Sequence, residues 1–361
     1  MTEAATRSNA GRGSLAGWYT PPLMNQVTFE DQQFQLTEYE SVLDCLLRHG
    51  QAIPYACRAG LCQACLVKTV NSQASAESQR WIKPELRALG YTLACQWVPD
   101  ADVSVALPDL NDFSTTARIR ERTLLAPQVL CLRLEIPDPG TMFACRPGQY
   151  LNLINPQGVS RPYSIANDYE HDGYIELHIA ATTHGVLSHW LFETATCGSV
   201  VHLRGPAGEC YYREQELNAT PLLLAGTGTG LAPLFVILQD ALRKGHQARI
   251  DLFHGAQDAG QLYLHTALQE LAQAHPNLHY HPCVRKGVCP PGVQCESIEK
   301  ALTASLDAKT LSPAAAFLCG APDFVHSMRK TLYLKGLRAQ RIYSDPFTER
   351  QVVTTQSGGK T

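Results

Sequence analysis

Long apolar runs and an excess of either charge are missing from this sequence of 361 residues. The longest apolar stretch, around residues 222–225, ends at a glycine, which excludes a bilayer-spanning helix. The 30 basic and 33 acidic residues give a net charge of −3, which argues against broad binding to nucleic acid. The G-x-S-x-G and H-E-x-x-H motifs are also missing. These absences favour a soluble, cytoplasmic globular protein without membrane insertion.

The length predicts two or three domains, each with its own core. Residues 1–23 are rich in Ser, Gly, Ala and Thr without periodicity, and we expect a disordered leader there. A transit peptide is the less favoured alternative, because no amphipathic helix is evident. The polar residues 348–361 are expected to form a disordered tail.

Cysteine, in contrast, is abundant, with thirteen residues, and four of them follow a recognisable pattern. Cys57, Cys62, Cys65 and Cys95 are separated by four, two and twenty-nine residues, the spacing of a plant-type [2Fe–2S] ferredoxin. A zinc site would favour a second C-x₂-C pair around Cys95, and disulfides are disfavoured because no secretory segment is evident. We therefore predict that these four cysteines hold a [2Fe–2S] cluster. Gln63 departs from the ferredoxin loop, where glycine is common.

Periodicity predicts three folded parts. Residues 24–112 contain short alternating strands, a helix capped by Ser41 and the cysteine loop, which suits a small β-grasp-like ferredoxin sheet. Residues 113–216 contain several alternating strands at short spacing, which predict an antiparallel β-barrel with one helix near 185–193.

Residues 217–347 alternate strands with helices, and we expect helices at 231–243 and 262–274. The apolar run 221–225 is typical of a strand that is buried on both faces. This pattern predicts a doubly wound α/β domain with a parallel sheet. The expected fold class is therefore multidomain, α+β followed by α/β.

A second candidate site begins with Arg161, Pro162, Tyr163 and Ser164 at the end of a barrel strand. A flavin needs an aromatic ring to stack on, a cation at its pyrophosphate and a hydrogen-bonding group near N5. The segment resembles the R-x-Y-S motif of the ferredoxin–NADP reductase-like flavoproteins. That resemblance implies that Arg161 pairs with pyrophosphate, Tyr163 stacks on the isoalloxazine and Ser164 lies near N5 as a catalytic residue.

The helix expected after Gly185 offers a second anion site, because the amides of a first turn point outward. Gly185, Val186 and Ser188 lie where the same family has its G-x-x-[ST] segment. By resemblance these residues also bind the FAD pyrophosphate. The alternative is that Gly185 and Ser188 simply begin a helix.

A third candidate site follows the buried strand, with Gly226, Thr227, Gly228 and Gly230 opening a helix. Glycines let the backbone approach a pyrophosphate at a helix start. The spacing is not the Rossmann pattern, because Leu231 holds its last glycine position. It resembles the G-T-G-x-A-P turn of the reductase family.

The segment Cys319-Gly320-Ala321-Pro322 is similar to the C-G-x-P of that family. The resemblance implies that Cys319 is catalytic beside the nicotinamide and flavin rings, with Gly320 next to it. Phe347 would approach the flavin as part of a closing acid-x-aromatic segment. Residues 254–258 contain no Lys or Arg and contain an acid suited to a ribose hydroxyl, which favours NADH over NADPH.

The order of these motifs over residues 24–347 resembles the single-chain reductase components of bacterial oxygenases. The resemblance implies an NADH-dependent iron–sulfur flavoprotein that passes electrons from NADH through FAD and the cluster to a partner oxygenase component, with Arg58 and Gln63 in the docking surface. We expect it to be monomeric alone. Two alternatives are a reductase acting with a deoxysugar dehydratase and a redox-sensing module without turnover.

The remaining cysteines give weaker patterns. His279, His281 and Cys283 alternate on one strand and could hold a metal, although strand alternation alone explains them. Cys283, Cys289 and Cys295 have no common metal spacing. We expect free thiols there, with a redox-sensitive surface as the alternative.

Overall fold

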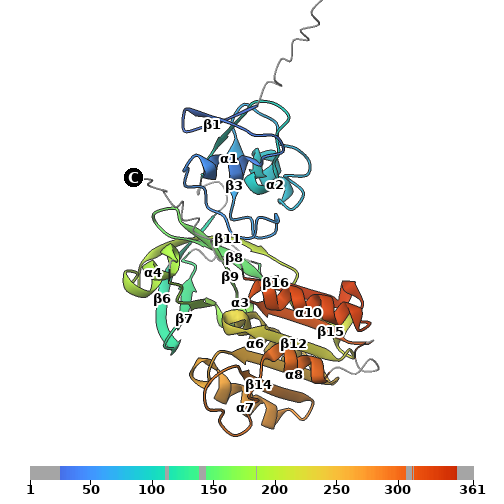
Figure 1. Cartoon of the computed structure of the whole chain (residues 1–361). Helices are drawn as coiled ribbons and strands as arrows, with labels where there is room; N and C mark the ends of the chain where they lie inside the picture. Colours follow the sequence, from blue (N-terminus) through green and yellow to red (C-terminus); the bar gives the residue numbers. More distant parts are fainter. Residues whose placement is uncertain are drawn as a thin grey trace, which may run out of the picture.

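The computed structural model describes residues 25–109, 114–137, 144–183, 185–305, 311 and 313–347. The predicted leader and tail lie outside these residues. Three units follow one another along the chain: an N-terminal unit, a barrel unit and an α/β unit (Figure 1). Within the described ranges, every helix is too short or too polar to cross a membrane. The predicted domain boundaries stay predictions.

The N-terminal unit is a mixed sheet in the order β2-β1-β5-β3-β4. Its strands are β1 (Gln26–Phe29), β2 (Gln32–Gln35), β3 (Leu66–Thr69), β4 (Tyr91–Leu93) and β5 (Val103–Ala106). Helix α1 (Val42–Arg48) begins where the hydroxyl of Ser41 accepts from the amide of Asp44 at 3.1 Å. Helix α2 (Pro84–Ala88) and the short helix η1 (Ala94–Gln96) complete the unit. Of the loop cysteines, Cys65 belongs to the apolar core of the unit, whereas Cys62 packs with Ala56 and Ala64 in a small cluster of its own.

The barrel unit is antiparallel throughout, in the order β10-β7-β6-β11-β8-β9. Its strands are β6 (Thr115–Ala126), β7 (Val129–Glu135), β8 (Tyr150–Ile154), β9 (Ser160–Ser164), β10 (Ile175–Ala180) and β11 (Val200–Ala207). A bridge between Ile165 and Leu177 joins the edge strands, because it connects the end of β9 to β10. The expected helix is α4 (Val186–Glu193), and one-turn helices α3 (Tyr169–Asp172) and α5 (Glu214–Leu217) add to it.

The α/β unit is a parallel sheet in the order β14-β13-β12-β15-β16. Its strands are β12 (Leu222–Thr227), β13 (Ile250–Ala256), β14 (Leu278–Val284), β15 (Ala315–Gly320) and β16 (Ile342–Pro346). Helices α6 (Leu231–Arg243) and α7 (His265–Ala274) pack on one face, and α8 (Ile298–Ser305) and α10 (Pro322–Leu334) pack on the other. The predicted doubly wound sheet is confirmed.

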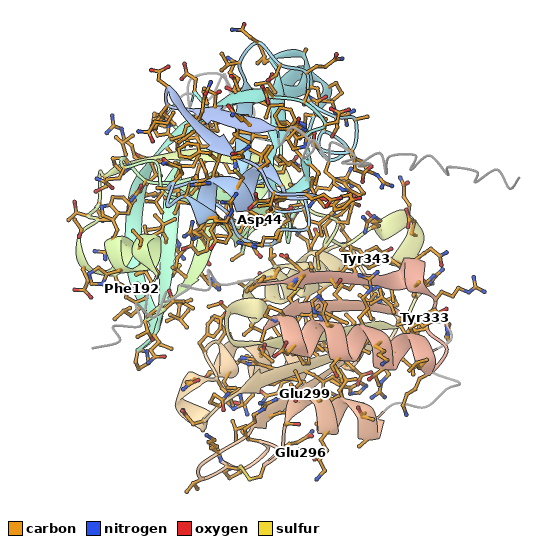
Figure 2. The ribbon with its side chains drawn as sticks, turned by 45° about the horizontal axis from the view of Figure 1, so that its top comes forward. Asp44, Phe192, Glu296, Glu299, Tyr333 and Tyr343 are labelled. Carbon is orange, nitrogen blue, oxygen red and sulfur yellow. A yellow bond between two sulfur atoms is a disulfide. The ribbon has the colours of Figure 1, made fainter. Side chains whose placement is uncertain are left out.

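One helix begins later than we expected. The prediction started it at residue 262, whereas α7 begins at His265. Leu264 has φ +57°, a left-handed conformation that a helix cannot continue through. Figure 2 shows how side chains cover these units, with Phe192 on the barrel and Tyr333 and Glu299 on the α/β helices.

Candidate functional site

The structure gathers the four predicted cluster ligands at one end of the N-terminal unit. Cys57, Cys62 and Cys65 lie on the loop before β3, and Cys95 lies on η1. The amides of Cys57 and Ala64 point at the sulfur of Cys62, at 3.4 and 3.5 Å. The amides of Ala59 and Cys62 point at the sulfur of Cys57, at 3.4 and 3.3 Å. Such amides stabilise sulfur that carries negative charge, which fits an iron–sulfur cluster.

The thiols also act on one another in two pairs. The side chain of Cys62 lowers the pKa of Cys57 to about 5, and the side chain of Cys65 lowers the pKa of Cys95 to about 7. Thiolate is the form that ligates metal. Within each pair the partner thiol has a raised pKa, because the two sulfurs share a hydrogen bond that favours one thiolate and disfavours a second.

Backbone conformation explains two residues of this loop. Gly60 has φ +79°, and a Cβ there would lie 3.0 Å from Cγ of Gln96. Gln63 has φ +55°, a left-handed conformation that glycine adopts more readily than other residues. This backbone requirement explains why glycine is common at this position in ferredoxins. The side-chain amide of Gln63 compensates by donating to the carbonyl of Trp81 at 2.8 Å. The departure at Gln63 is therefore accommodated by a local contact.

Side chains of the barrel hold the same loop from outside. The Tyr150 hydroxyl donates to the carbonyl of Leu61, and the Asn152 amide donates to the carbonyl of Cys62 at 2.9 Å. Arg204 donates to the next carbonyl, that of Gln63. We call these three contacts the barrel seam. Three consecutive carbonyls are thus bound by strands β8 and β11, which fixes one edge of the loop against the barrel.

The barrel seam opens on a cavity of about 1190 Å³. The cavity is bounded by the cluster loop, the end of β9, the start of α4, the α6 turn and the β16 segment. Its lining from these five elements includes Cys57, Leu61, Cys62, Gln63, Arg161, Pro162, Tyr163, Ser164, Gly185, Leu187, Ser188, Thr229, Ala232, Tyr343, Ser344, Asp345, Pro346 and Phe347. All three units therefore meet at one chamber that is large enough for a dinucleotide.

The predicted flavin residues at the start of α4 divide into two groups. Gly185 and Ser188 line the cavity, whereas Val186 does not and is 55% exposed. The Ser188 hydroxyl lies 2.8 Å from the hydroxyl of Thr182, and a Cβ at Gly185 would lie 1.9 Å from the latter oxygen. A glycine is thus required by close packing of this turn, and Val186 offers only its backbone to a ligand.

Asp345 is a cavity residue that we did not include among the predicted site residues. The Ser164 hydroxyl donates to its carboxylate at 3.2 Å. Burial raises the pKa of Asp345 to about 7. Perturbed acids in cavities mark functional sites. The acid-x-aromatic segment in the sequence was the pattern that pointed here.

The predicted nicotinamide turn interlocks with the end of β15. A Cβ at Gly230 would lie 2.4 Å from the carbonyl oxygen of Cys319, and one at Gly320 would lie 2.5 Å from the hydroxyl of Thr227. The amide of Ala321 donates to that same hydroxyl at 3.0 Å. The glycines therefore permit two loops that are distant in sequence to touch.

The same residues lie behind the cavity lining rather than in it. Thr229 and Ala232 line the chamber, but the other predicted turn residues (Gly226, Thr227, Gly228 and Gly230) and Gly320 are not among its lining residues. Cys319 is fully buried, and its sulfur lies 3.5 Å from that of Cys210, which does line the chamber. Cys319 itself is not among the residues that line the chamber. A direct catalytic contact of Cys319 stays a prediction.

Two cations near residues 254–258 were missed because they follow the next strand, β14, which ends at Val284. The amide of Arg285 donates to the carbonyl of Ala256, and that of Lys286 donates to the carbonyl of Gln257. The Arg285 guanidinium pairs with Glu299 at 2.6 Å. Residues 254–258 are therefore flanked by two cations, and one of them, Arg285, already has an ion-pair partner.

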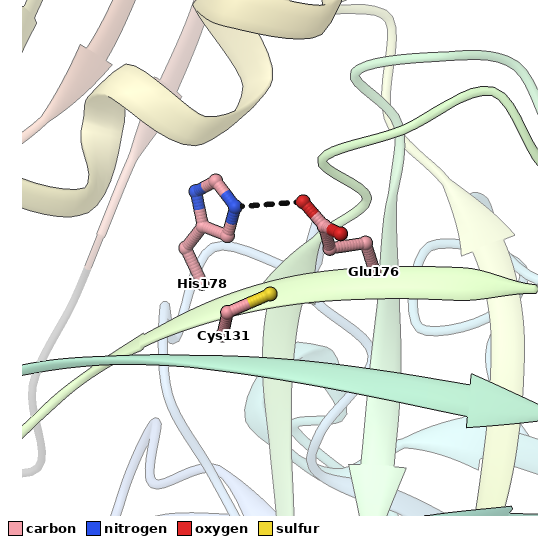
Figure 3. Close-up of side chains that lie close together, drawn as sticks. All are labelled: Cys131, Glu176 and His178. Carbon is pink, nitrogen blue, oxygen red and sulfur yellow. Dashed lines mark hydrogen bonds and ion pairs between the residues drawn. The ribbon is translucent and has the colours of Figure 1, made fainter. Parts of the chain in front are cut away.

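Cys131, Glu176 and His178 form a second cluster of ligand-type groups, on the outer face of the barrel (Figure 3). The Glu176 carboxylate is held by Arg133 at 2.7 Å and by His178 at 3.1 Å. The other ring nitrogen of His178 lies 3.4 Å from the hydroxyl of Tyr263 on the α/β unit. Burial raises the pKa of the Cys131 thiol to about 12. These contacts make the cluster a hydrogen-bonded link between two units.

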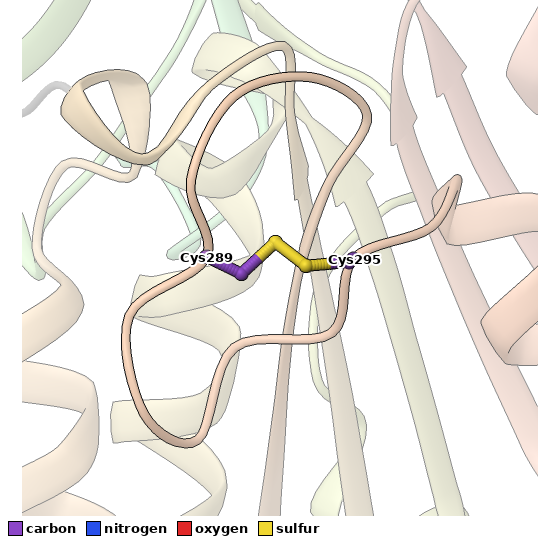
Figure 4. The surroundings of a disulfide bond; sticks show 2 residues. All are labelled: Cys289 and Cys295. Carbon is purple, nitrogen blue, oxygen red and sulfur yellow. A yellow bond between two sulfur atoms is a disulfide. The ribbon is translucent and has the colours of Figure 1, made fainter.

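One expectation for the α/β unit is corrected. Cys289 and Cys295 form a disulfide across the loop after β14, whereas we expected free thiols (Figure 4). The two residues lie six positions apart, with a Pro-Pro-Gly turn between them that brings the sulfurs together. His281 stacks on Phe253 and pairs with Asp251 at 2.9 Å, and these contacts account for the position of its ring without a metal. Cys283 is free and buried.

Family models match three segments of the chain in the expected order. Residues 27–100 match a 2Fe-2S iron-sulfur cluster binding domain, residues 116–212 an oxidoreductase FAD-binding domain, and residues 224–330 an oxidoreductase NAD-binding domain. The predicted cofactor classes are confirmed. The protein is an oxidoreductase with a [2Fe–2S] domain, an FAD domain and an NAD domain.

Relatives match most of the chain. The reductase component of the naphthalene 1,2-dioxygenase system of Pseudomonas putida is 30% identical, over 85% of this chain and 93% of that protein. A deoxysugar reductase of Yersinia pestis, the CDP-6-deoxy-L-threo-D-glycero-4-hexulose-3-dehydrase reductase, is 26% identical over the same shares. The crystal structure of an Amycolatopsis cytochrome P450 reductase has a TM-score of 0.64 and 27% identity, covering 90% of this chain and 99% of that one. The chain therefore belongs to the family of ferredoxin–NAD(P)⁺ reductase components, with a [2Fe–2S] domain ahead of the FAD-binding and NAD-binding domains.

Proposed function

We propose that this protein is the reductase component of an oxygenase system, taking electron pairs from NADH and delivering electrons singly to an oxygenase partner. The observation that carries the proposal is the shared chamber, in which Cys57 and Cys62 lie with the Arg161–Ser164 segment. Electron transfer between two centres requires them to be close. A chamber that joins both sets of residues meets that requirement within one chain.

FAD, when bound, accepts a hydride and can release its electrons one at a time. We propose that Arg161 and the first-turn amides of α4 hold its pyrophosphate and that Tyr163 stacks on its ring. Ser164 and Asp345 would hold a proton at the edge of the chamber, since the carboxyl pKa of about 7 lets it gain or lose one near neutrality.

The preference for NADH is part of this proposal. Asp258 remains suited to a ribose hydroxyl, and Arg285 is neutralised by Glu299. Lys286 then remains as one exposed cation beside the loop. A 2′-phosphate would have to compete with Glu299 for Arg285, which favours the coenzyme without that phosphate.

Because the barrel seam covers one edge of the cluster loop, we assign different roles to its two edges. Gln63, which we expected in the partner surface, has its carbonyl on Arg204 and lines the chamber. Arg58 lies on the other side of the loop, where it is half-exposed and its carbonyl accepts from Gln96 at 3.0 Å. We therefore propose that the partner approaches at Arg58 and Gln96, and that the Gln63 edge receives electrons.

An anaerobic titration with NADH, and with NADPH beside it, tests the proposal. We expect flavin bleaching together with a rhombic [2Fe–2S] signal in low-temperature EPR, at lower concentrations of NADH than of NADPH. Bleaching without a cluster signal, in protein of confirmed iron content, would contradict the relay.

A deoxysugar-dehydratase reductase is the second candidate, because a relative of that activity matches 85% of this chain. The two candidates share the relay and differ in the partner. Reconstitution of the reduced protein with each class of partner, an oxygenase component or a dehydratase, separates them by which one shows turnover. The third alternative is a redox-sensing module without turnover. Rapid, steady oxidation of NADH with ferricyanide as the acceptor would contradict it.

A further inference from the structure

Arg204 is a buried cation on strand β11, placed against the cluster loop. Only 5% of its surface is exposed, and its guanidinium donates to the carbonyl of Gln63, next to the ligand position Cys62. Its register partner on β8 is Asn152, which binds the carbonyl of Cys62 itself. Two neighbouring strands thus present one charged and one neutral donor to adjacent carbonyls. The pair offers a natural comparison of charge with hydrogen bonding.

The position is costly for a cation, since burial disfavours an isolated charge. Burial lowers the pKa of Arg204 to about 10, opposed by negative charge at Cys65 and Cys62. The guanidinium consequently stays protonated at neutral pH. Negative charge on the cysteines predicted to hold the cluster is one of the influences that favour its protonated form.

We propose that Arg204 sets the direction of electron flow, because its fixed positive charge favours the reduced cluster over the oxidised one. This inference rests on the proposed function. NADH supplies the electrons that the reduced flavin holds. Each electron that passes from the flavin to the cluster adds one negative charge to the cluster. A fixed cation at the barrel seam attracts that added charge more strongly in a buried site than in water. Arg204 therefore has two roles. It is a positioning residue that holds the cluster loop through the carbonyl of Gln63, and its charge raises the reduction potential of the cluster.

The test is a potentiometric titration of the cofactor-loaded protein with dithionite and mediators, with the cluster followed by EPR. In Arg204→Gln we expect the one-electron equilibrium of the cluster to move about tenfold toward the oxidised form, which is about 59 mV more negative. Arg204→Lys, which keeps the charge, should stay within about threefold of the wild type. A potential in Arg204→Gln within twofold of the wild type would overturn the proposal.

Asn152→Leu is the matched neutral control. It removes a hydrogen bond to the same loop without changing charge, so we expect its cluster potential to stay close to that of the wild type. If it shifts the potential as far as Arg204→Gln does, loosening of the seam explains both and the electrostatic role is wrong.

Two further points keep the outcome decisive. Iron and flavin contents are measured in every variant, and if Arg204→Gln retains no cluster, Arg204→Lys decides. A tenfold shift in that charge-retaining variant would contradict the proposal. Because dithionite replaces NADH and no partner is present, failure here is distinct from failure of the proposed relay, which the NADH titration reports.

Discussion

The cluster loop and the glycine turn before α6 are both predicted cofactor-binding segments with closely packed backbone, and they are built in different ways. In the cluster loop, four amides point at sulfur atoms, and the outer edge is held by side chains of another unit. In the turn, Gly230 and Gly320 let two backbone segments of one unit pack directly on each other. We expect the first arrangement to be completed by the [2Fe–2S] cluster. The second is complete without its ligand.

This difference predicts where a substitution does damage. A ligand that is part of the local structure makes its loop sensitive to the loss of a single sulfur. A turn that is already packed without its ligand should be destabilised by a larger side chain where other atoms lie close, and should tolerate one where the space is open. The following predictions test that contrast, from the largest expected effect to the smallest.

Removing a cluster ligand should have the largest effect. In Cys62→Ser we expect reduction of a one-electron protein acceptor to fall by more than about a hundredfold, because the cluster outlet is lost. NADH-to-ferricyanide activity should persist, since the flavin and NAD parts are untouched. Parallel assays with cytochrome c and ferricyanide measure both. Cys197→Ser, at an exposed cysteine, is the control, and normal delivery by Cys62→Ser would refute the outlet.

Adding one methyl group to the turn should have the next effect. In Gly230→Ala the new carbon would meet the Cys319 carbonyl at 2.4 Å, so the backbone must move. We expect a cost of about 1–3 kcal/mol and a KM for NADH raised about tenfold. Steady-state kinetics and thermal unfolding measure these.

Gly228 provides the matched control for this turn. It has open space around its Cβ position and φ +54°, a left-handed conformation that Asn adopts more readily than other side chains, so Gly228→Asn should cost less than Gly230→Ala. Equal damage in both variants would mean that the turn is sensitive to its ligand contacts rather than to packing.

The buried acid in the chamber gives a pH prediction. The pKa of Asp345 is raised to about 7 in the folded protein, so the unfolded chain loses this proton first as pH rises. The acid therefore costs stability progressively between about pH 4 and pH 7, up to about 4 kcal/mol. Asp345→Asn removes this cost.

The apparent Tm of Asp345→Asn minus that of the wild type should rise between pH 4 and 7 and level off above. Scanning calorimetry of the flavin-free protein over that range measures it. A difference that is flat with pH would show that Asp345 does not titrate in that range.

Coenzyme preference should change least. Glu299→Gln frees the Arg285 guanidinium, and we expect kcat/KM for NADPH to rise about twofold to fivefold, with little change for NADH. Glu296→Gln is the control, because it breaks the nearby pair with Lys300 and leaves Arg285 paired. The ratio of the two coenzymes is the measurement, and an unchanged ratio would exclude Arg285 as a phosphate partner.

Local patterns predicted much of the fold and the site. Alternation gave the barrel strands, and the helix expected at residues 231–243 is α6 itself. The start of α7 was wrong because the positive φ of Leu264 leaves no mark in hydrophobic periodicity. The cations at Arg285 and Lys286 were missed because a loop's neighbours come from strand order, not from its own residues.

The sequence alone predicted the three-part order and the cofactor classes, which the family models confirm, and the four cluster ligands, which stay a prediction; spacing and periodicity act over a few residues and leave a local record. Only the tertiary structure placed Asn152 and Arg204 on Cys62 and Gln63, about ninety and 141 positions away in sequence. It also brought Asp345 to Ser164, 181 positions apart. Such contacts depend on how whole units pack. A buried charge finds its partner only after the chain has folded around it.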